Sequence, residues 1–301
     1  MRLISILSVF LSVSAAQADV PRVSVDIAPV HSLVAQVMDG VGVPDLILRP
    51  GASPHHYALR PSEAAALDNA DMVIWMGEEL TPWLATAVDT LSGEARLLAL
   101  LDAEETHLLP LREGIGFEDE AHDHEEAHEH HGESDPHAWL SPENAQRWLF
   151  LIADELSALD PEHAALFKAN AARGAEALGD MRQAIRTELA PVKEARSLLF
   201  HDAYQYFEAA FDVPAVAAIS LSDASRPGPA RIAALRELAE EQQINCILTE
   251  PQFDPKLAQA ILPDGHMVGV LDPMGTEFEP GVGLYVSMMQ ALAAGFASCA
   301  R

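Results

Sequence analysis

Three histidines occupy places in the sequence where metal chemistry is expected. His55 lies in the stretch RPGASPHHYALRP, His137 in SDPHAWLSP and His201 in LLFHDAY. His55 and His201 each follow a strand-like segment, whereas His137 precedes a helix-like one. In parallel sheets, ligands gather beyond the carboxyl ends of strands, where neighbouring loops converge. One histidine on each of three distant loops is therefore the arrangement that a metal site between two lobes needs, and imidazole nitrogen suits Zn²⁺.

Two carboxylates also end strand-like segments, Glu250 in ILTEPQF and Asp272 in GVLDPMGT. Glu250 is either a solvated carboxylate or the hydrogen-bond partner of a ligand's second ring nitrogen. Asp272 is either a cap before Pro273 or an oxygen ligand in the fourth position. The competing interpretation of each histidine is a hydrogen-bonded structural residue, the commoner role for a lone histidine at a strand end. Position alone therefore indicates a metal site without establishing it.

The tract from residue 113 to residue 134 is acidic, rich in histidine and almost free of large apolar side chains. Such a composition favours a surface loop over a packed element. We expect its imidazoles and carboxylates to hold zinc loosely near the site, the alternative being an acidic loop with incidental affinity. The histidines of this auxiliary set are His122, His124, His128, His130 and His131.

Strand-like and helix-like segments alternate along the rest of the chain, which predicts parallel sheets covered by helices. The expected strands lie at 22–27, 45–50, 71–77, 95–101, 197–200, 215–220, 244–250 and 267–272. The expected helices lie at 29–40, 62–70, 81–93, 143–159, 161–190, 202–211, 228–243, 254–262 and 283–300. We therefore predict an α/β fold of two lobes, each with a mainly parallel sheet flanked by helices.

The longest expected helix, 161–190, joins the lobes. Leu178, Met181, Ile185 and Leu189 recur in it at helical spacing and form one apolar face. An unbroken helix of this length would rise ~45 Å, about the size of a domain, so we interpret it as a rigid strut. The expected organisation is an N-terminal lobe at 19–140, connecting helices at 141–195 and a C-terminal lobe at 196–301.

Composition limits the partners and the compartment. The chain has 301 residues, a formal net charge of −28 and a pI near 4.6, so its field repels nucleic acid and anionic lipid and attracts cations. Residues 1–18 have the positive start, the apolar run and the AQA end of a secretory signal peptide that is cleaved after Ala18. The apolar run is too short to span a membrane, and we expect an exported mature chain without membrane insertion.

Cys246 and Cys299 are the only cysteines of the chain. An oxidising compartment favours a disulfide between them. The bond would close a loop of 53 positions, which contributes about 4 kcal/mol in the chain-entropy model. The alternative is a pair of buried free thiols.

Five motifs, taken in order, resemble those of the ZnuA-type (cluster 9, or cluster A-I) zinc-specific substrate-binding proteins of ABC importers. They are PGASPHHYALRPSE, DPHAWLSPEN, FHDAYQYF, TEPQFDP and LDPMGT, and the resemblance covers essentially the whole mature chain. It implies zinc ligands at His55, His137 and His201, with Asp272, slightly favoured over water, in the fourth position. Manganese and iron relatives place a carboxylate where His201 stands, which favours zinc here. Some zinc members carry a glutamate before the first ligand, and Pro54 stands there in this chain.

The resemblance further implies a periplasmic protein that captures Zn²⁺ between two lobes bridged by a rigid helix and delivers it to an ABC permease. The acidic His-rich loop and the cysteine pair of the C-terminal lobe belong to the same pattern. We expect a monomer without catalytic activity. The alternatives are a periplasmic zinc buffer or chaperone, a manganese- or iron-binding relative, and a secreted zinc hydrolase with Glu250 as its candidate general base.

Overall fold

The computed structural model describes residues 20–117, 134–192, 195–220, 227–251, 255–262 and 266–300. The predicted signal peptide, 1–18, lies outside the described residues, and so do the five histidines of the auxiliary set. The described flanks of that tract lie side by side, because Pro110 and Ser134 form an isolated antiparallel bridge. Within the described ranges, no helix is long and apolar enough to cross a membrane.

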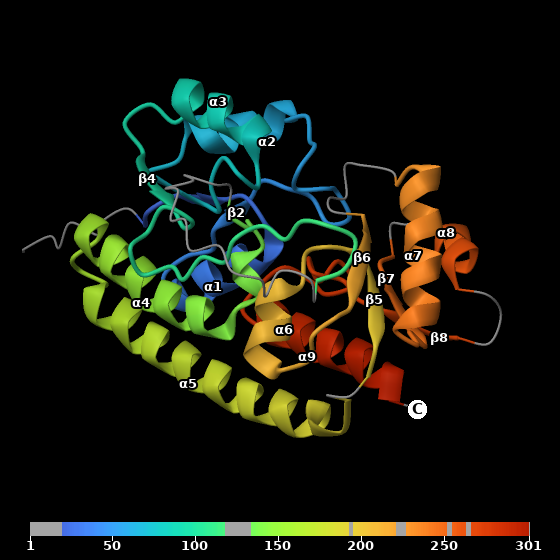
Figure 1. The fold of residues 1–301 in the computed structure, drawn as a ribbon. Coiled ribbons are helices and arrows are strands. Elements are labelled where there is room, and N and C mark those ends of the chain that lie inside the picture. Colours follow the sequence, from blue (N-terminus) through green and yellow to red (C-terminus); the bar gives the residue numbers. More distant parts are fainter. Residues whose placement is uncertain are drawn as a thin grey trace, which may run out of the picture.

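The N-terminal lobe is built on a parallel four-stranded sheet in the order β2-β1-β3-β4. Its elements are β1 (Val23–Val25), α1 (Ala28–Val37), β2 (Asp45–Leu46), α2 (Pro61–Asp68), β3 (Met72–Trp75), α3 (Pro82–Leu91) and β4 (Arg96–Ala99). Side chains of β3 alternate between the faces: Met72 and Ile74 join the central core, whereas Val73 and Trp75 join the cluster under α2 and α3. Figure 1 shows α2 and α3 together over that outer face and α1 on the other side of the sheet.

The C-terminal lobe repeats this plan with a second parallel sheet in the order β6-β5-β7-β8. Its elements are β5 (Ser197–His201), α6 (Gln205–Phe211), β6 (Ala217–Ser220), α7 (Pro229–Glu241), β7 (Cys246–Thr249), α8 (Pro255–Ile261), β8 (Met267–Val270) and α9 (Leu284–Ala297). In β5, Leu198 and Phe200 face the cluster that includes residues of α7 and α8, while Leu199 faces the central core. All eight predicted strands are present, and the two-lobed α/β prediction is confirmed.

Two long helices connect the lobes, α4 (Pro142–Leu159) and α5 (Ala164–Leu189), and they lie side by side along one edge of the molecule (Figure 1). The 26 residues of α5 rise ~39 Å. The helix begins three residues later than predicted. Pro161–His163 form a turn before it, in which the Asp160 carboxylate accepts hydrogen bonds from the backbone N–H groups of Glu162 (3.2 Å) and His163 (3.3 Å). It ends at Leu189, where the 3₁₀ turn Ala190–Val192 follows.

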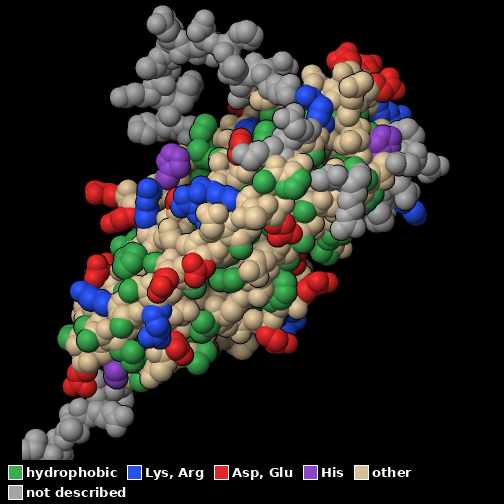
Figure 2. Space-filling view, turned by 90° about the horizontal axis from the view of Figure 1, so that it is seen from below, with side chains coloured by type: hydrophobic (Ala, Val, Ile, Leu, Met, Phe, Trp, Pro, Cys, Tyr) green, Lys and Arg blue, Asp and Glu red, His purple; other side chains and the backbone are tan. Residues whose placement is uncertain are grey.

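One continuous apolar core spans both lobes, and α9 of the C-terminal lobe packs against α1 of the N-terminal lobe. At the start of α9, the Tyr285 backbone N–H donates to the Ser32 hydroxyl of α1 at 3.0 Å, and this hydroxyl donates to the Val282 carbonyl at 3.1 Å. The lobes are therefore joined by direct contact as well as by α4 and α5. Acidic and basic side chains are interspersed over the face shown in Figure 2.

The predicted disulfide between Cys246 and Cys299 is confirmed, with Cα atoms 5.5 Å apart. It joins the first residue of β7 to the 3₁₀ turn Ser298–Ala300 that follows α9. Both sulfur-bearing side chains are buried. The bond thus fastens the end of the chain to the centre of the second sheet.

Candidate metal centre

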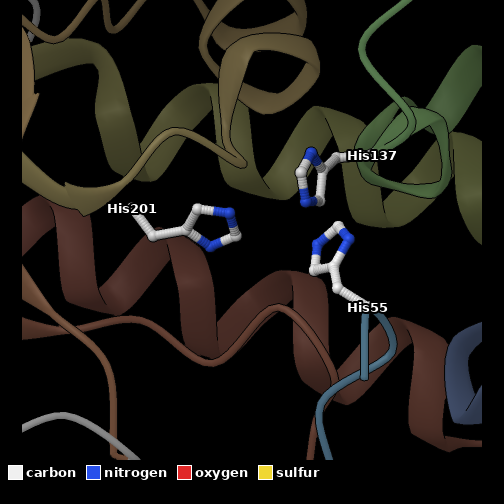
Figure 3. A group of neighbouring side chains, drawn as sticks. All are labelled: His55, His137 and His201. Atoms are coloured by element: carbon white, nitrogen blue, oxygen red, sulfur yellow. The ribbon is translucent and has the colours of Figure 1, made fainter. Parts of the chain in front are cut away.

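The structure brings His55, His137 and His201 together although 146 positions separate the first from the last. One ring nitrogen of each lies within 4.8 Å of the others. The ring centroids are 5.0 Å apart for His137 and His201, 5.4 Å for His55 and His137, and 6.0 Å for His55 and His201. Figure 3 shows the three rings turned toward one common point from three different segments. Such a triangle of imidazoles can hold one small cation.

His201 is the last residue of β5, at the carboxyl edge of the second sheet, and is 3% exposed. Its Nδ1 lies 3.5 Å from Oε1 of Glu250, which follows β7, the neighbouring strand. Glu250 is itself 2% exposed. Burial, and then the negative charge of Glu250, raise the pKa of the nearby Tyr204 hydroxyl well above its usual value. Tyr204 therefore stays protonated beside this carboxylate.

His137 stands directly before the 3₁₀ turn Ala138–Leu140 and is 4% exposed. Both its backbone N–H (3.0 Å) and its ring Nδ1 (2.7 Å) approach the same oxygen, Oδ1 of Asp135. A ring that donates Nδ1–H to a carboxylate carries its lone pair on Nε2, the nitrogen then available to a metal. Burial raises the pKa of Asp135 to about 7, against the lowering effect of the His137 backbone N–H. A cation bound nearby would favour the ionised form of this carboxyl.

His55 lies on the segment between β2 and α2, which has no regular secondary structure. It is the least buried of the three histidines, being partly exposed where the other two are buried. Its backbone N–H donates to the Ser53 hydroxyl at 3.2 Å. The neighbouring His56 is exposed and does not belong to the converging group.

A cavity of about 370 Å³ adjoins the histidines and has walls from both lobes. The N-terminal lobe contributes Gly51 to His55, and the C-terminal lobe contributes Glu250 and the segment that begins at Asp272. The centre therefore lies where the two lobes meet, as a site that takes up and gives back a ligand requires.

Asp272 lines this cavity but does not belong to the group of ligand atoms within 4.8 Å. Its Oδ1 accepts from the backbone N–H groups of Met274 (3.0 Å) and Gly275 (3.1 Å). Its Oδ2 accepts from the backbone N–H (2.6 Å) and the hydroxyl (2.5 Å) of Thr276. An ionised carboxylate has about four acceptor positions, and all four are in use within this loop.

Asp135 and Arg112 are the parts of the centre that sequence reasoning missed. Asp135 could have been found, since a carboxylate two residues before His137 can reach its Nδ1. Arg112 could not, because nothing in the sequence pairs it with its partners. Its guanidinium lies 3.0 Å from Asp202, the residue after His201, and 2.9 Å from Glu208. It thereby fastens the segment that follows β4 to the loop of a candidate ligand.

The fold agrees with the comparisons to known proteins. A family model described as "Zinc-uptake complex component A periplasmic" matches residues 23–299. The high-affinity zinc uptake system protein ZnuA of Paracoccus denitrificans is 39% identical over 94% of this chain and 93% of its own length. The protein of the same name from Yersinia pestis is 32% identical over 91% of this chain and 90% of its own length.

Solved structures show the same fold. A crystal structure of ZnuA has a TM-score of 0.78 at 22% identity and covers 94% of this chain and 100% of its own. The Zn(II)-bound ZnuA-like domain of Streptococcus pneumoniae AdcA has a TM-score of 0.69 at 24% identity, over 92% of this chain and 99% of its own. On the strength of the family model and the relatives, the chain belongs to the family of periplasmic zinc-uptake components.

Proposed function

We propose that the protein captures Zn²⁺ with His55, His137 and His201 and delivers it, in the periplasm, to the permease of an ABC importer. The observation that carries this proposal is the convergence of three imidazoles from three distant segments within 4.8 Å. Neutral imidazole prefers Zn²⁺, whereas Mn²⁺ prefers carboxylate and water oxygens in a larger shell. The family and the named function of the relatives support zinc import.

The fourth ligand in this proposal is water, with Asp272 as the competing candidate. All acceptor positions of the Asp272 carboxylate are occupied by its own loop, so coordination would break at least one of those hydrogen bonds. The adjoining cavity has room for solvent next to the histidines. Three imidazoles and one water make a four-coordinate site from which the metal can leave.

The carboxylates near the histidines serve binding in this proposal. Asp135 and Glu250 each lie beside the Nδ1 atom of a ligand, where a carboxylate orients the ring and strengthens it as a donor to metal. A catalytic zinc site would instead need a general base that reaches the bound water. We therefore propose transport, in which the auxiliary histidines between 122 and 131 hold zinc loosely before it enters the site.

Competition between metals tests the proposal. The chain from residue 19 onward, and the same chain lacking residues 118–133, are stripped of metal, mixed with equal Zn²⁺ and Mn²⁺, desalted and assayed for both. We expect one tightly held zinc per chain in the shortened protein and little manganese. Bound manganese would contradict the ligand set, and a shortened chain without either metal would leave the His-rich tract as the real binding site.

A further inference from the structure

The loop that carries His55 forms the N-terminal wall of the metal cavity without help from regular structure. Gly51, Ser53, Pro54 and His55 all line the cavity, and the chain between β2 and α2 contributes no helix or strand here. His137 and His201 are fixed next to a 3₁₀ turn and at the end of a strand. His55 therefore needs contacts of its own to point at the metal.

The peptide unit that joins Pro54 to His55 is held at both of its polar atoms. The indole Nε1–H of Trp83 donates to the Pro54 carbonyl at 2.7 Å, and the His55 N–H donates to the Ser53 hydroxyl at 3.2 Å. Because a peptide unit is planar, two hydrogen bonds on opposite edges fix its orientation. That plane contains the N–Cα bond of His55, so its orientation determines where the His55 side chain starts.

Trp83 also contacts the other flank of His55. Its ring lies 5.1 Å from that of Tyr57, centroid to centroid, in a tilted arrangement. The Tyr57 hydroxyl donates to Glu63 of α2 at 2.7 Å and accepts from Arg49 at 2.7 Å. One side chain of α3 thus contacts the residue before His55 and the residue two positions after it.

The helix that carries Trp83 is packed against the core of the N-terminal lobe. It is the second residue of α3, whose Leu84 and Val88 side chains are buried in the cluster under α2 and α3. The indole is partly buried and packs against the same cluster. The hydrogen bond to the loop therefore starts from a helix that the core of the N-terminal lobe holds in place.

We propose that Trp83 is a positioning residue for zinc binding, which holds His55 in its metal-binding orientation through the Pro54 carbonyl. This inference rests on the proposed function, because it concerns the same three-histidine site. Without the indole N–H, the Pro54–His55 peptide can rotate, and the His55 ring then leaves the bound zinc more often. The loss appears mainly as faster dissociation of zinc, since contacts around a formed site act chiefly on the off-rate.

A pair of tryptophan variants tests the proposal in the full mature chain. Trp83→Phe keeps an aromatic ring and removes one indole donor. Trp148→Phe is its matched control, because Trp148 donates its Nε1–H to the Thr106 hydroxyl at 2.8 Å inside the core. Zinc dissociation into an excess of chelator is followed by stopped flow. We expect release about fivefold faster in Trp83→Phe, the change that one hydrogen bond of ordinary strength makes, and an unchanged rate in Trp148→Phe.

A double-variant comparison separates positioning from a general loss of stability. In the His55→Ala background, Trp83→Phe should change zinc binding no further, because the ligand through which it acts is gone. Equal effects of Trp83→Phe with and without His55, or a wild-type off-rate in the single variant, would overturn the inference. Failure of the proposed function has a different signature, namely a chain lacking residues 118–133 that retains no zinc at all.

Discussion

The three histidines are held in two different ways. His137 and His201 are buried, and each has a buried carboxylate near its Nδ1 atom: Asp135 at 2.7 Å and Glu250 at 3.5 Å. His55 lies on a partly exposed loop, and the two hydrogen bonds to the peptide unit before it join uncharged groups. The buried pair is therefore supported by neighbouring carboxylates, whereas hydrogen bonds between uncharged groups hold the peptide unit that precedes His55.

This difference predicts how the site distributes its affinity. A carboxylate next to an imidazole fixes the ring tautomer, makes the ring a better donor and adds negative charge near the cation. A hydrogen bond from an indole to a backbone carbonyl only restricts conformation. Loss of the Asp135 carboxylate should therefore cost more zinc affinity than loss of the indole hydrogen bond to Pro54.

Removal of a ligand gives the largest effect. Replacement of His55, His137 or His201 by alanine leaves two imidazoles, so we expect zinc affinity to fall by more than the ~100-fold upper range for loss of an outer partner. The measurement is competition against a chelator of known affinity. His56→Ala is the matched control, since it removes an exposed imidazole next to a ligand and should leave zinc affinity unchanged. If the three ligand variants bind zinc as tightly as the control, the site lies elsewhere.

The next largest effect is expected for Asp135→Asn. The amide keeps the shape of the side chain but loses the charge and the second acceptor oxygen that support His137. Zinc affinity should fall ~10–100-fold, the usual range for a carboxylate that supports a metal-bound histidine. Calorimetric titration with zinc at several temperatures would separate this change in zinc affinity from a loss of folded protein. An affinity within twofold of wild type would mean that Asp135 shapes the loop and does not support the metal.

Glu250→Gln should have a smaller effect than Asp135→Asn. Its Oε1 lies 3.5 Å from Nδ1 of His201, beyond the distance of a good hydrogen bond, whereas Asp135 approaches its histidine to 2.7 Å. We expect a loss of zinc affinity of about tenfold or less, at the low end of the range for such partners. Chelator competition on both variants, measured side by side, shows which variant loses more zinc affinity. The reverse order would show that Glu250 moves closer to His201 when zinc is bound.

The parts of this centre differ in how far the sequence predicted them. Each of the three histidines follows a predicted strand or precedes a predicted helix, where parallel-sheet topology brings loops together, and the motifs select the same residues. The contact of Trp83 with Pro54 could not be predicted from the sequence, because 29 positions separate the two residues and helical periodicity only indicates that α3 covers the sheet. Likewise, the sequence left Asp272 between two roles, and only the hydrogen bonds of its loop show that its oxygens are already occupied.

The smallest effect on zinc is expected for a buried carboxylate outside the centre. Asp26 follows β1, is fully buried, and accepts hydrogen bonds from the backbone N–H groups of Ile27 (2.7 Å) and Met76 (2.8 Å). Like Asp135 it is buried, but it does not line the metal cavity. Asp26→Asn should therefore leave zinc affinity unchanged. A drop comparable to that of Asp135→Asn would mean that buried negative charge anywhere in the N-terminal lobe supports the metal.

Asp26 should instead control how stability depends on pH. Burial raises the pKa of Asp26 from 3.8 to about 7, with backbone hydrogen bonds acting in the opposite direction. Between these values the folded protein binds the proton and the unfolded chain does not, so the free energy of unfolding falls as the pH rises from about 4 to about 7. The full difference amounts to at most about 4 kcal/mol. Urea unfolding of metal-free protein at pH 5 and pH 8 measures the part of this difference that lies above pH 5, and the drop should be smaller in Asp26→Asn, because no proton is then lost at this position. An equal drop in the variant would assign the pH dependence to other buried carboxyls, with Asp135 as the first to test.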